Sequence, residues 1–202
     1  MGLTQEFEAK YWAQNKLVLG LDEAGRGPMA GPCVVAGVVF PKGYDNDLID
    51  DSKKLSVKKR QEIVKMIYDD ALEYGVGIIP VEDIDRLNIY QATKVAMEAI
   101  AHDLDCDVVL TDALPIDVNK ETESIIKGDA RSISIAAASI IAKTIRDQIM
   151  IEYDKKYPEY GFKNHKGYGT KKHKEAILKY GRTPIHRKSF RFKNEDQMSL
   201  DI

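Results

Sequence analysis

The sequence predicts one α/β domain with a small C-terminal appendage. Its 202 residues are enough for one substantial core, and its 44% hydrophobic and 31% charged residues are an ordinary globular composition. Short apolar, β-branched runs alternate with stretches in which apolar residues recur at helical spacing. No apolar run approaches membrane-spanning length, and residues 1–17 lack the apolar core of a signal peptide. We therefore expect a cytoplasmic monomer without membrane contact.

The expected strands are short and apolar. Residues 33–40 are nearly all apolar and β-branched, which is typical of a strand buried on both faces. The five expected strands are residues 16–22, 33–40, 76–81, 108–112 and 123–127.

The expected helices alternate with these strands. Ser56 is a good N-cap for one helix, and Gly75 suits its C-terminal end. The run from Ala136 to Ala138 permits a long helix to pack closely on the sheet. The expected helices are residues 4–15, 56–73, 88–104, 132–156 and 171–180.

Charge divides the chain unevenly. We expect a body of residues 1–156, a basic helical region of residues 157–193 and a flexible tail of residues 194–202. Residues 155–193 hold thirteen Lys and Arg against two acidic residues, a local charge of +11, so the remainder carries −13 of the total of −2. A solvated basic face explains this pattern, but a surface that contacts a phosphate backbone explains it better.

The two cysteines, Cys33 and Cys106, lie within or beside expected strands. They are not spaced for a zinc site, and a pair of buried free thiols in a reducing compartment is expected rather than a disulfide.

Four acidic residues follow or precede expected elements. Asp22 and Asp112 each end an apolar strand, and parallel neighbouring strands would bring them to one edge of the sheet. Glu23 follows Asp22, and Asp129 precedes the long helix. Clustered carboxylates repel one another unless protons or cations intervene, and hard divalent cations prefer oxygen ligands. For any one acid, a turn or a helix N-terminus is an equal explanation.

Neighbouring residues on a strand point to opposite faces. Asp22 and Glu23 can therefore share a site only where the strand ends or bulges, or where Glu23 uses its backbone carbonyl.

A glycine-rich turn follows these acids. Gly25 and Gly27 flank Arg26, so the backbone can approach a ligand while the guanidinium meets a phosphate. The alternative for Arg26 is a structural ion-pair partner of one of the acids.

At this point the sequence resembles bacterial ribonuclease HII, a type 2 ribonuclease H. The related ribonuclease HIII branch carries a different basic residue in the glycine turn, whereas this chain has Arg26. The resemblance is carried by GLDEAGRGPMAGP (20–32), DSKKLS (51–56), LNIYQAT (87–93), TDALPI (111–116), KGDARSISIAAASIIAKTIRD (127–147), HKGYGTKKH (165–173) and HRKSF (186–190).

The resemblance implies a ribonuclease H-like mixed five-stranded sheet with flanking helices and a small helical C-terminal region. It implies that two Mg²⁺ or Mn²⁺ ions are held by the four acids that match the family's ligands: Asp22, Glu23, Asp112 and Asp129.

The resemblance also implies substrate contacts. Gly25, Arg26 and Gly27 match the turn that surrounds the scissile phosphate and senses the ribose 2′-hydroxyl, the group that distinguishes RNA from DNA. Tyr168 matches a tyrosine that contacts this hydroxyl, and Lys53 a phosphate-contacting lysine. Without the family, Tyr168 would be a surface tyrosine and Lys53 a solvated lysine. Asn88 is expected near the substrate strand.

The implied activity is metal-dependent cleavage of RNA in RNA–DNA hybrids and at ribonucleotides embedded in duplex DNA, as in ribonucleotide excision repair. The products would carry 5′-phosphate and 3′-hydroxyl ends. The alternatives are a DNA nuclease of the same superfamily, and a non-catalytic nucleic-acid-binding module that uses the basic region.

The histidines and Arg146 are not expected to be catalytic. His165, His173 and His186 are expected to be structural or close to phosphates, and His102 to lie on the surface. Arg146 is expected to pair with a neighbouring acid.

The C-terminal tail suggests a protein partner. Gln197, Met198, Leu200 and Ile202 resemble the short peptides that dock on the bacterial sliding clamp, and spaced apolar anchors on a flexible tail suit binding in a groove. A tail without function is an equally good explanation.

Overall fold

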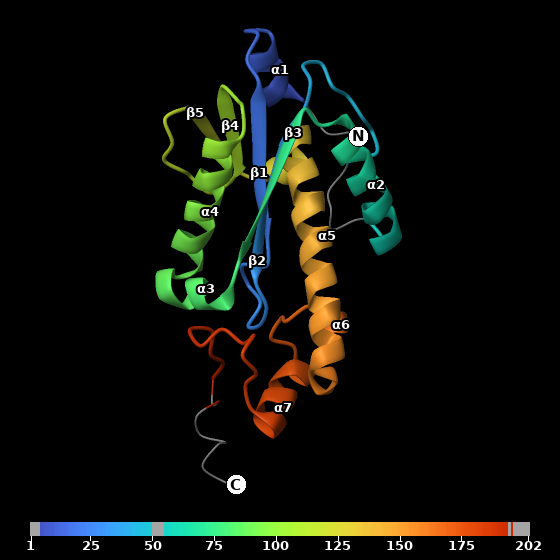
Figure 1. The fold of residues 1–202 in the computed structure, drawn as a ribbon, viewed down its shortest axis with the longest axis vertical. Helices are drawn as coiled ribbons and strands as arrows, with labels where there is room; N and C mark the ends of the chain where they lie inside the picture. Colours follow the sequence, from blue (N-terminus) through green and yellow to red (C-terminus); the bar gives the residue numbers. More distant parts are fainter. Residues whose placement is uncertain (1–4, 50–54, 194, 196–202) are drawn as a thin grey trace.

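The computed structural model describes residues 5–49, 55–193 and 195 (Figure 1). At its centre is a five-stranded sheet in the order β3-β2-β1-β4-β5. The β1–β2 and β2–β3 pairs are antiparallel, whereas β1–β4 and β4–β5 are parallel, so the predicted mixed sheet is confirmed. The strands are β1 (Val18–Ala24), β2 (Cys33–Val39), β3 (Glu73–Ile79), β4 (Val108–Asp112) and β5 (Glu121–Ile125).

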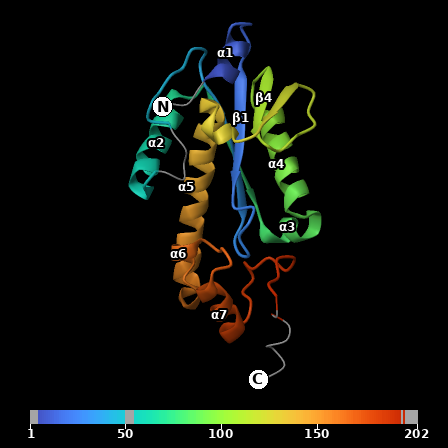
Figure 2. The same cartoon turned by 180° about the vertical axis from the view of Figure 1, so that it is seen from behind.

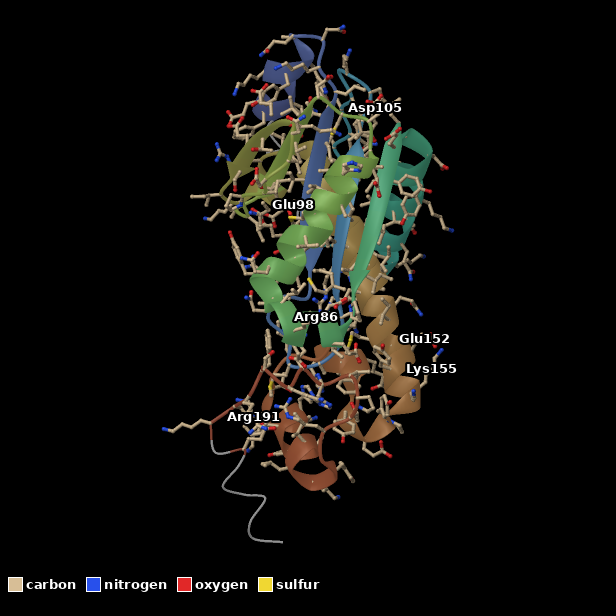
Figure 3. All side chains as sticks on the ribbon, turned by 60° about the vertical axis from the view of Figure 1, so that its left-hand side comes forward. Arg86, Glu98, Asp105, Glu152, Lys155 and Arg191 are labelled. Carbon is tan, nitrogen blue, oxygen red and sulfur yellow. The ribbon has the colours of Figure 1, made fainter. Side chains whose placement is uncertain are left out.

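Helices cover both faces of this sheet. The long α5 and α2 lie on one face, and α3 and α4, which carry Arg86 and Glu98, lie on the other (Figure 3). The short α1 packs at the end of the sheet where β1 begins (Figures 1 and 2). The helices are α1 (Glu6–Trp12), α2 (Val57–Asp70), α3 (Val81–Leu87), α4 (Ile89–Asp103), α5 (Ile133–Lys156), α6 (Phe162–His165) and α7 (Lys171–Tyr180), with 3₁₀ turns η1 (Gly128–Ala130) and η2 (Pro158–Tyr160).

Small residues bring α5 directly onto β1. A side chain at Gly20 would begin 2.3 Å from the carbonyl carbon of Ser134, so only glycine permits this approach. Ala136, Ala137 and Ala138 are all fully buried in the layer between α5 and the sheet. This contact fixes α5 relative to the strand that carries Asp22.

Two local predictions were wrong. Gly75 does not stop a helix: α2 ends at Asp70, and Gly75 lies inside β3, where a Cβ would stand 3.1 Å from Ile100 of α4. Its small size serves helix–sheet packing rather than helix termination. The seven-residue α3 was not predicted, because it is too short to show a repeated apolar spacing.

The elements after α5 build an apolar cluster of their own around Tyr160, Phe162 and Ile177. Met29, Ala30 and Met150 also belong to it, so these C-terminal elements pack against the segment between β1 and β2 and against α5. The boundary expected at residues 156 and 157 falls where α5 ends, and a division into separate units stays a prediction.

Both cysteines are free and buried, as predicted. In the part of the chain that the structure describes, no helix has the length and apolar character needed to span a bilayer.

Candidate active site

A cavity of about 270 Å³ lies at the C-terminal end of β1, facing the C-terminal elements. Acidic side chains, the glycine turn and cations from α5 meet in it. It is lined by Asp22, Glu23, Ala24, Gly25, Arg26, Gly27, Asp112, Ser139, Lys143, Arg146 and Tyr168.

The parallel pairing of β1 and β4 brings Asp22 and Asp112 together, as the sequence predicted. Leu21 pairs with Thr111, so the next residue of each strand reaches the same edge of the sheet. Burial is the main cause that raises the pKa of Asp22 well above its usual range, and the charges of Glu23 and Asp112 raise it further. A hydrogen bond from Ser139 of α5 opposes that rise.

Glu23 joins the cavity although β1 runs on to Ala24. The backbone N–H of Glu23 donates to Asp22 Oδ1 at 2.7 Å. Arg26 Nη1 lies 3.2 Å from Glu23 Oε1, so the ion pair that was an alternative for Arg26 is present. The same arginine also lines the cavity.

Asp129 lies in η1 and is buried, but it does not line the cavity. It is linked to the cavity through its neighbour, because the Gly128 N–H donates to Asp112 Oδ1 at 2.8 Å. Within residues 5–49, 55–193 and 195, no three His, Cys, Asp or Glu side chains are arranged to hold one metal ion. The joint role of the four acids as ligands therefore stays a prediction.

The glycine turn and Tyr168 are neighbours in the lining of the cavity. A Cβ built on Gly27 would stand 3.5 Å from Tyr168 Cε1, and the ring is 49% exposed. Gly25 has φ of +100°, and a Cβ there would overlap Arg146 at 1.9 Å, so this position requires glycine. The turn and the aromatic ring are thus close neighbours, although more than 140 residues separate them in the sequence.

The remaining predicted contacts lie elsewhere. Asn88 caps α4, where its Oδ1 accepts from the Gln91 N–H at 3.1 Å, and it does not line the cavity. Lys53 lies outside the described residues, as do the tail positions Gln197, Met198, Leu200 and Ile202.

Sequence reasoning missed how α5 supplies the cavity. Ser139, Lys143 and Arg146 are spaced by about one helical turn and line it from one side. Lys143 Nζ lies 2.5 Å from Asp147, which also accepts from Arg60 Nη2 at 2.7 Å. The spacing along residues 139–147 was the available signal.

The expectation that Arg146 pairs with an acid was wrong. Its guanidinium is buried and donates to the backbone carbonyls of Pro32, Ala30 and Lys166. It joins the segment that follows the glycine turn to the loop before Tyr168, whereas the neighbouring Asp147 pairs with Arg60 and Lys143.

The histidines are structural. His173 and His186 are buried, with 3.0 Å between their Nε2 atoms, and His165 stacks on His173. Burial is the main cause that lowers the pKa of each of the buried pair to about 4. His102 is exposed, as predicted.

Several solved structures that superpose on this chain are ribonucleases of the H type. The ribonuclease HII of Archaeoglobus fulgidus, solved as a complex with PCNA, superposes with a TM-score of 0.75 over 90% of this chain and 99% of its own, at 25% identity. Bst-RNase HIII, solved with Mn²⁺, has the same fold, with a TM-score of 0.67 over 91% of this chain and 69% of its own, at 15% identity.

Sequence comparison narrows this class to one family. The family model described as Ribonuclease HII matches residues 19–193. Ribonuclease HII of Enterococcus faecalis is 53% identical over 190 residues, which are 93% of this chain and 74% of that protein. The chain belongs to the ribonuclease HII family and is an endoribonuclease of the ribonuclease H type.

Proposed function

We propose that this chain hydrolyses the phosphodiester bond at ribonucleotides, both in RNA–DNA hybrids and as single units within duplex DNA, leaving 5′-phosphate and 3′-hydroxyl ends. One observation carries the proposal. Asp22, Glu23 and Asp112 line the same cavity as the Gly25–Gly27 turn and Tyr168. Carboxylates suited to phosphodiester hydrolysis thus lie beside groups suited to reading a sugar.

The acids fit a site for divalent metal ions. Their oxygens are the ligands that Mg²⁺ and Mn²⁺ prefer, and the burial and mutual repulsion that raise the pKa of Asp22 are relieved by a nearby cation. Asp22, Glu23, Asp112 and Asp129 would hold two such ions, and Bst-RNase HIII, which shares the fold, was solved with Mn²⁺. Bound divalent ions supply water activation and stabilise the leaving oxygen in this type of hydrolysis.

The residues of the chain itself orient the substrate. The backbone of the glycine turn can approach the sugar–phosphate closely because Gly25 and Gly27 have no side chains, and Arg26 adds a positive charge beside it. Tyr168 can pack on a sugar and contact the 2′-hydroxyl. We propose that residues 157–193 form the substrate-binding region, and that Lys53 and Asn88 contact the strand backbone.

The test is a cleavage assay on a DNA duplex that contains one ribonucleotide. We expect cleavage with Mg²⁺ or Mn²⁺, no cleavage with a chelator, and no cleavage of the all-DNA duplex. Equal cleavage of both duplexes would favour a DNA nuclease of the superfamily. Binding without cleavage under every metal condition would favour a non-catalytic module.

We further propose that residues 197–202 dock on the sliding clamp. The A. fulgidus relative was solved in complex with PCNA, which supports a clamp partner for this family. Clamp affinity before and after deletion of these six residues tests this, and an unchanged affinity would exclude the tail as the docking peptide. We also propose a monomer in a reducing cytoplasm, in keeping with the free thiols.

A further inference from the structure

The side chain of Arg187 is fully buried and binds backbone carbonyls of the glycine turn. Its Nη2 donates to the carbonyl oxygen of Gly25 at 2.6 Å and its Nη1 to that of Arg26 at 2.9 Å. Its Nε and Nη2 both donate to the carbonyl of Gly31, at 3.0 and 2.9 Å. One guanidinium therefore binds two carbonyls of the glycine turn and a third, that of Gly31, in the segment that follows it, about 160 residues away in the sequence.

The charge of Arg187 is compensated by carbonyl dipoles. No carboxylate lies within ion-pair distance of it among the described residues, although several exposed lysines and arginines have one. Burial lowers its pKa to about 10, so it stays a cation at neutral pH. A buried charge is costly unless it is fully hydrogen-bonded, so this cation can be kept only while the turn presents its carbonyls.

Backbone hydrogen bonds fix the position of the Arg187 main chain. The Arg187 N–H donates to the Met29 carbonyl at 2.9 Å, and the Gly31 N–H donates to the Ile185 carbonyl at 2.8 Å. These bonds join the Arg187 segment to the segment that follows the glycine turn. The Arg187 main chain thus cannot shift relative to this segment without breaking backbone hydrogen bonds.

The planarity of the peptide bond determines where the N–H groups of the glycine turn point. All described peptide bonds are trans, so the N–H of Arg26 points opposite to the carbonyl of Gly25, and the N–H of Gly27 opposite to that of Arg26. Both carbonyls are directed at Arg187, which does not line the cavity, whereas Gly25, Arg26 and Gly27 do. The two N–H groups are therefore directed away from Arg187.

We propose that Arg187 is a positioning residue that keeps the N–H groups of Arg26 and Gly27 directed into the cavity as donors to the sugar–phosphate of the substrate. This inference rests on the proposed function. It assigns part of the substrate discrimination to a residue that never touches the substrate.

The test compares Arg187→Lys with Arg60→Lys. Arg60 is the matched control, because it is also a buried arginine that donates to a backbone carbonyl, that of Leu55 at 3.0 Å, but it lies in α2 and does not line the cavity. A lysine ammonium cannot bind three carbonyls in the geometry of the guanidinium fork. We expect the single-turnover rate constant of Arg187→Lys on the one-ribonucleotide duplex to fall by about 10- to 100-fold, since small misplacements of positioning groups have effects of this size.

This readout separates positioning from folding. With enzyme in saturating excess, a partly unfolded preparation loses active molecules but keeps its rate constant, whereas a misdirected turn lowers the rate constant itself. Arg60→Lys should keep a rate constant within about threefold of the unchanged protein. A normal rate constant for Arg187→Lys, or an equal fall in both variants, would overturn the proposal.

A measurement on the unchanged protein covers the case in which Arg187→Lys does not fold. We expect the amide hydrogens of Arg26 and Gly27 to exchange faster in the free protein than in its chelator-inhibited complex with the one-ribonucleotide duplex. Unaltered exchange at both amides would refute the inference. Absence of cleavage by the unchanged protein would instead refute the proposed function, and the exchange measurement would still decide the role of the amides.

Discussion

Asp22 shows how its surroundings set the chemistry of a single residue. It ends the buried part of β1, and its pKa is raised by burial, then by Glu23 and Asp112. The folded chain without metal therefore carries an unfavourable carboxylate at neutral pH. Such a group is suited to bind a cation, because binding relieves the repulsion that folding creates.

We predict that Asp22→Asn stabilises the metal-free protein at pH 7. The raised folded pKa means that the folded state binds the Asp22 proton more tightly than the unfolded state, so stability falls as pH rises from 3.8 through the folded pKa. Asp22→Asn has no carboxylate at this position, so its stability does not fall with pH for this reason. Urea unfolding with a chelator should give a higher midpoint for the variant at pH 7, and the difference should shrink toward pH 3.8. Added Mg²⁺ should stabilise the unchanged protein more than the variant.

We predict that Asp112→Asn abolishes hydrolysis and leaves hybrid binding intact. The amide keeps an oxygen that can accept from the Gly128 N–H, so the contact between β4 and η1 is retained while the charge is lost. Rates should fall by at least about 100-fold, the scale seen when an electrostatic group is removed from an active site. Cleavage and chelator-treated binding assays measure the two effects, and normal turnover would remove Asp112 from the metal site.

At the scale of elements, the N-terminal helix is tied to the segment that carries Asp129. Glu8 of α1 is fully buried, and its Oε1 accepts from Ser132 Oγ at 2.5 Å and from the Ser134 N–H at 3.0 Å. These contacts give the Ser132 hydroxyl and the Ser134 N–H a hydrogen-bond acceptor at the start of α5, directly after η1. A helix at one end of the chain thus stabilises the entry into the longest helix.

We predict that Glu8→Ala destabilises the fold by about 1–3 kcal/mol, the penalty for leaving buried hydrogen-bonding groups without a partner. Glu6→Ala is the control, because the ion pair between Glu6 and Arg131 is exposed and its loss should change stability by less than about 1 kcal/mol. Urea unfolding measures both, and equal effects of the two variants would refute the role of Glu8.

We predict that the buried histidine pair makes the fold acid-sensitive. His173 and His186 have folded pKa values of about 4 against an ordinary 6.5, so the unfolded state binds more protons and stability is lost as pH falls from 6.5 toward 4. The urea midpoint should fall between pH 7 and 5. His186→Gln should show a shallower fall, and identical slopes would show that this pair does not govern the response.

At the scale of the whole molecule, the C-terminal elements combine a structural and a basic part. Arg182 and Arg187 bind backbone carbonyls and Arg182 also pairs with Glu195, so these two charges serve the fold. Lys171 and Lys172 remain exposed at the start of α7, close after Tyr168. The +11 charge of residues 155–193 therefore overstates what is available to a nucleic acid.

We predict that Lys172→Gln weakens hybrid binding and lowers the slope of log affinity against log salt by about 1, the effect of one lost phosphate contact. Lys65→Gln on the exposed side of α2 is the matched control and should leave the slope unchanged. Titrations in a chelator at several salt concentrations give both slopes, and equal slopes for the two variants would place Lys172 outside the binding surface.

The sequence alone determined the features that depend on residues close to one another in the chain. These features are the apolar runs before Asp22 and Asp112, the glycines on both sides of Arg26 and the small residues of α5. Each is a pattern of neighbouring residues, and its role could be predicted from the chemistry of those residues. Tertiary structure alone decided which polar side chains are buried. The sequence did not predict that Arg146 and Arg187 bind backbone carbonyls or that His173 and His186 pair with each other. The physical reason is that the carbonyls bound by the two arginines lie more than 100 residues away for all but one of these contacts, and no local pattern encodes such a distance.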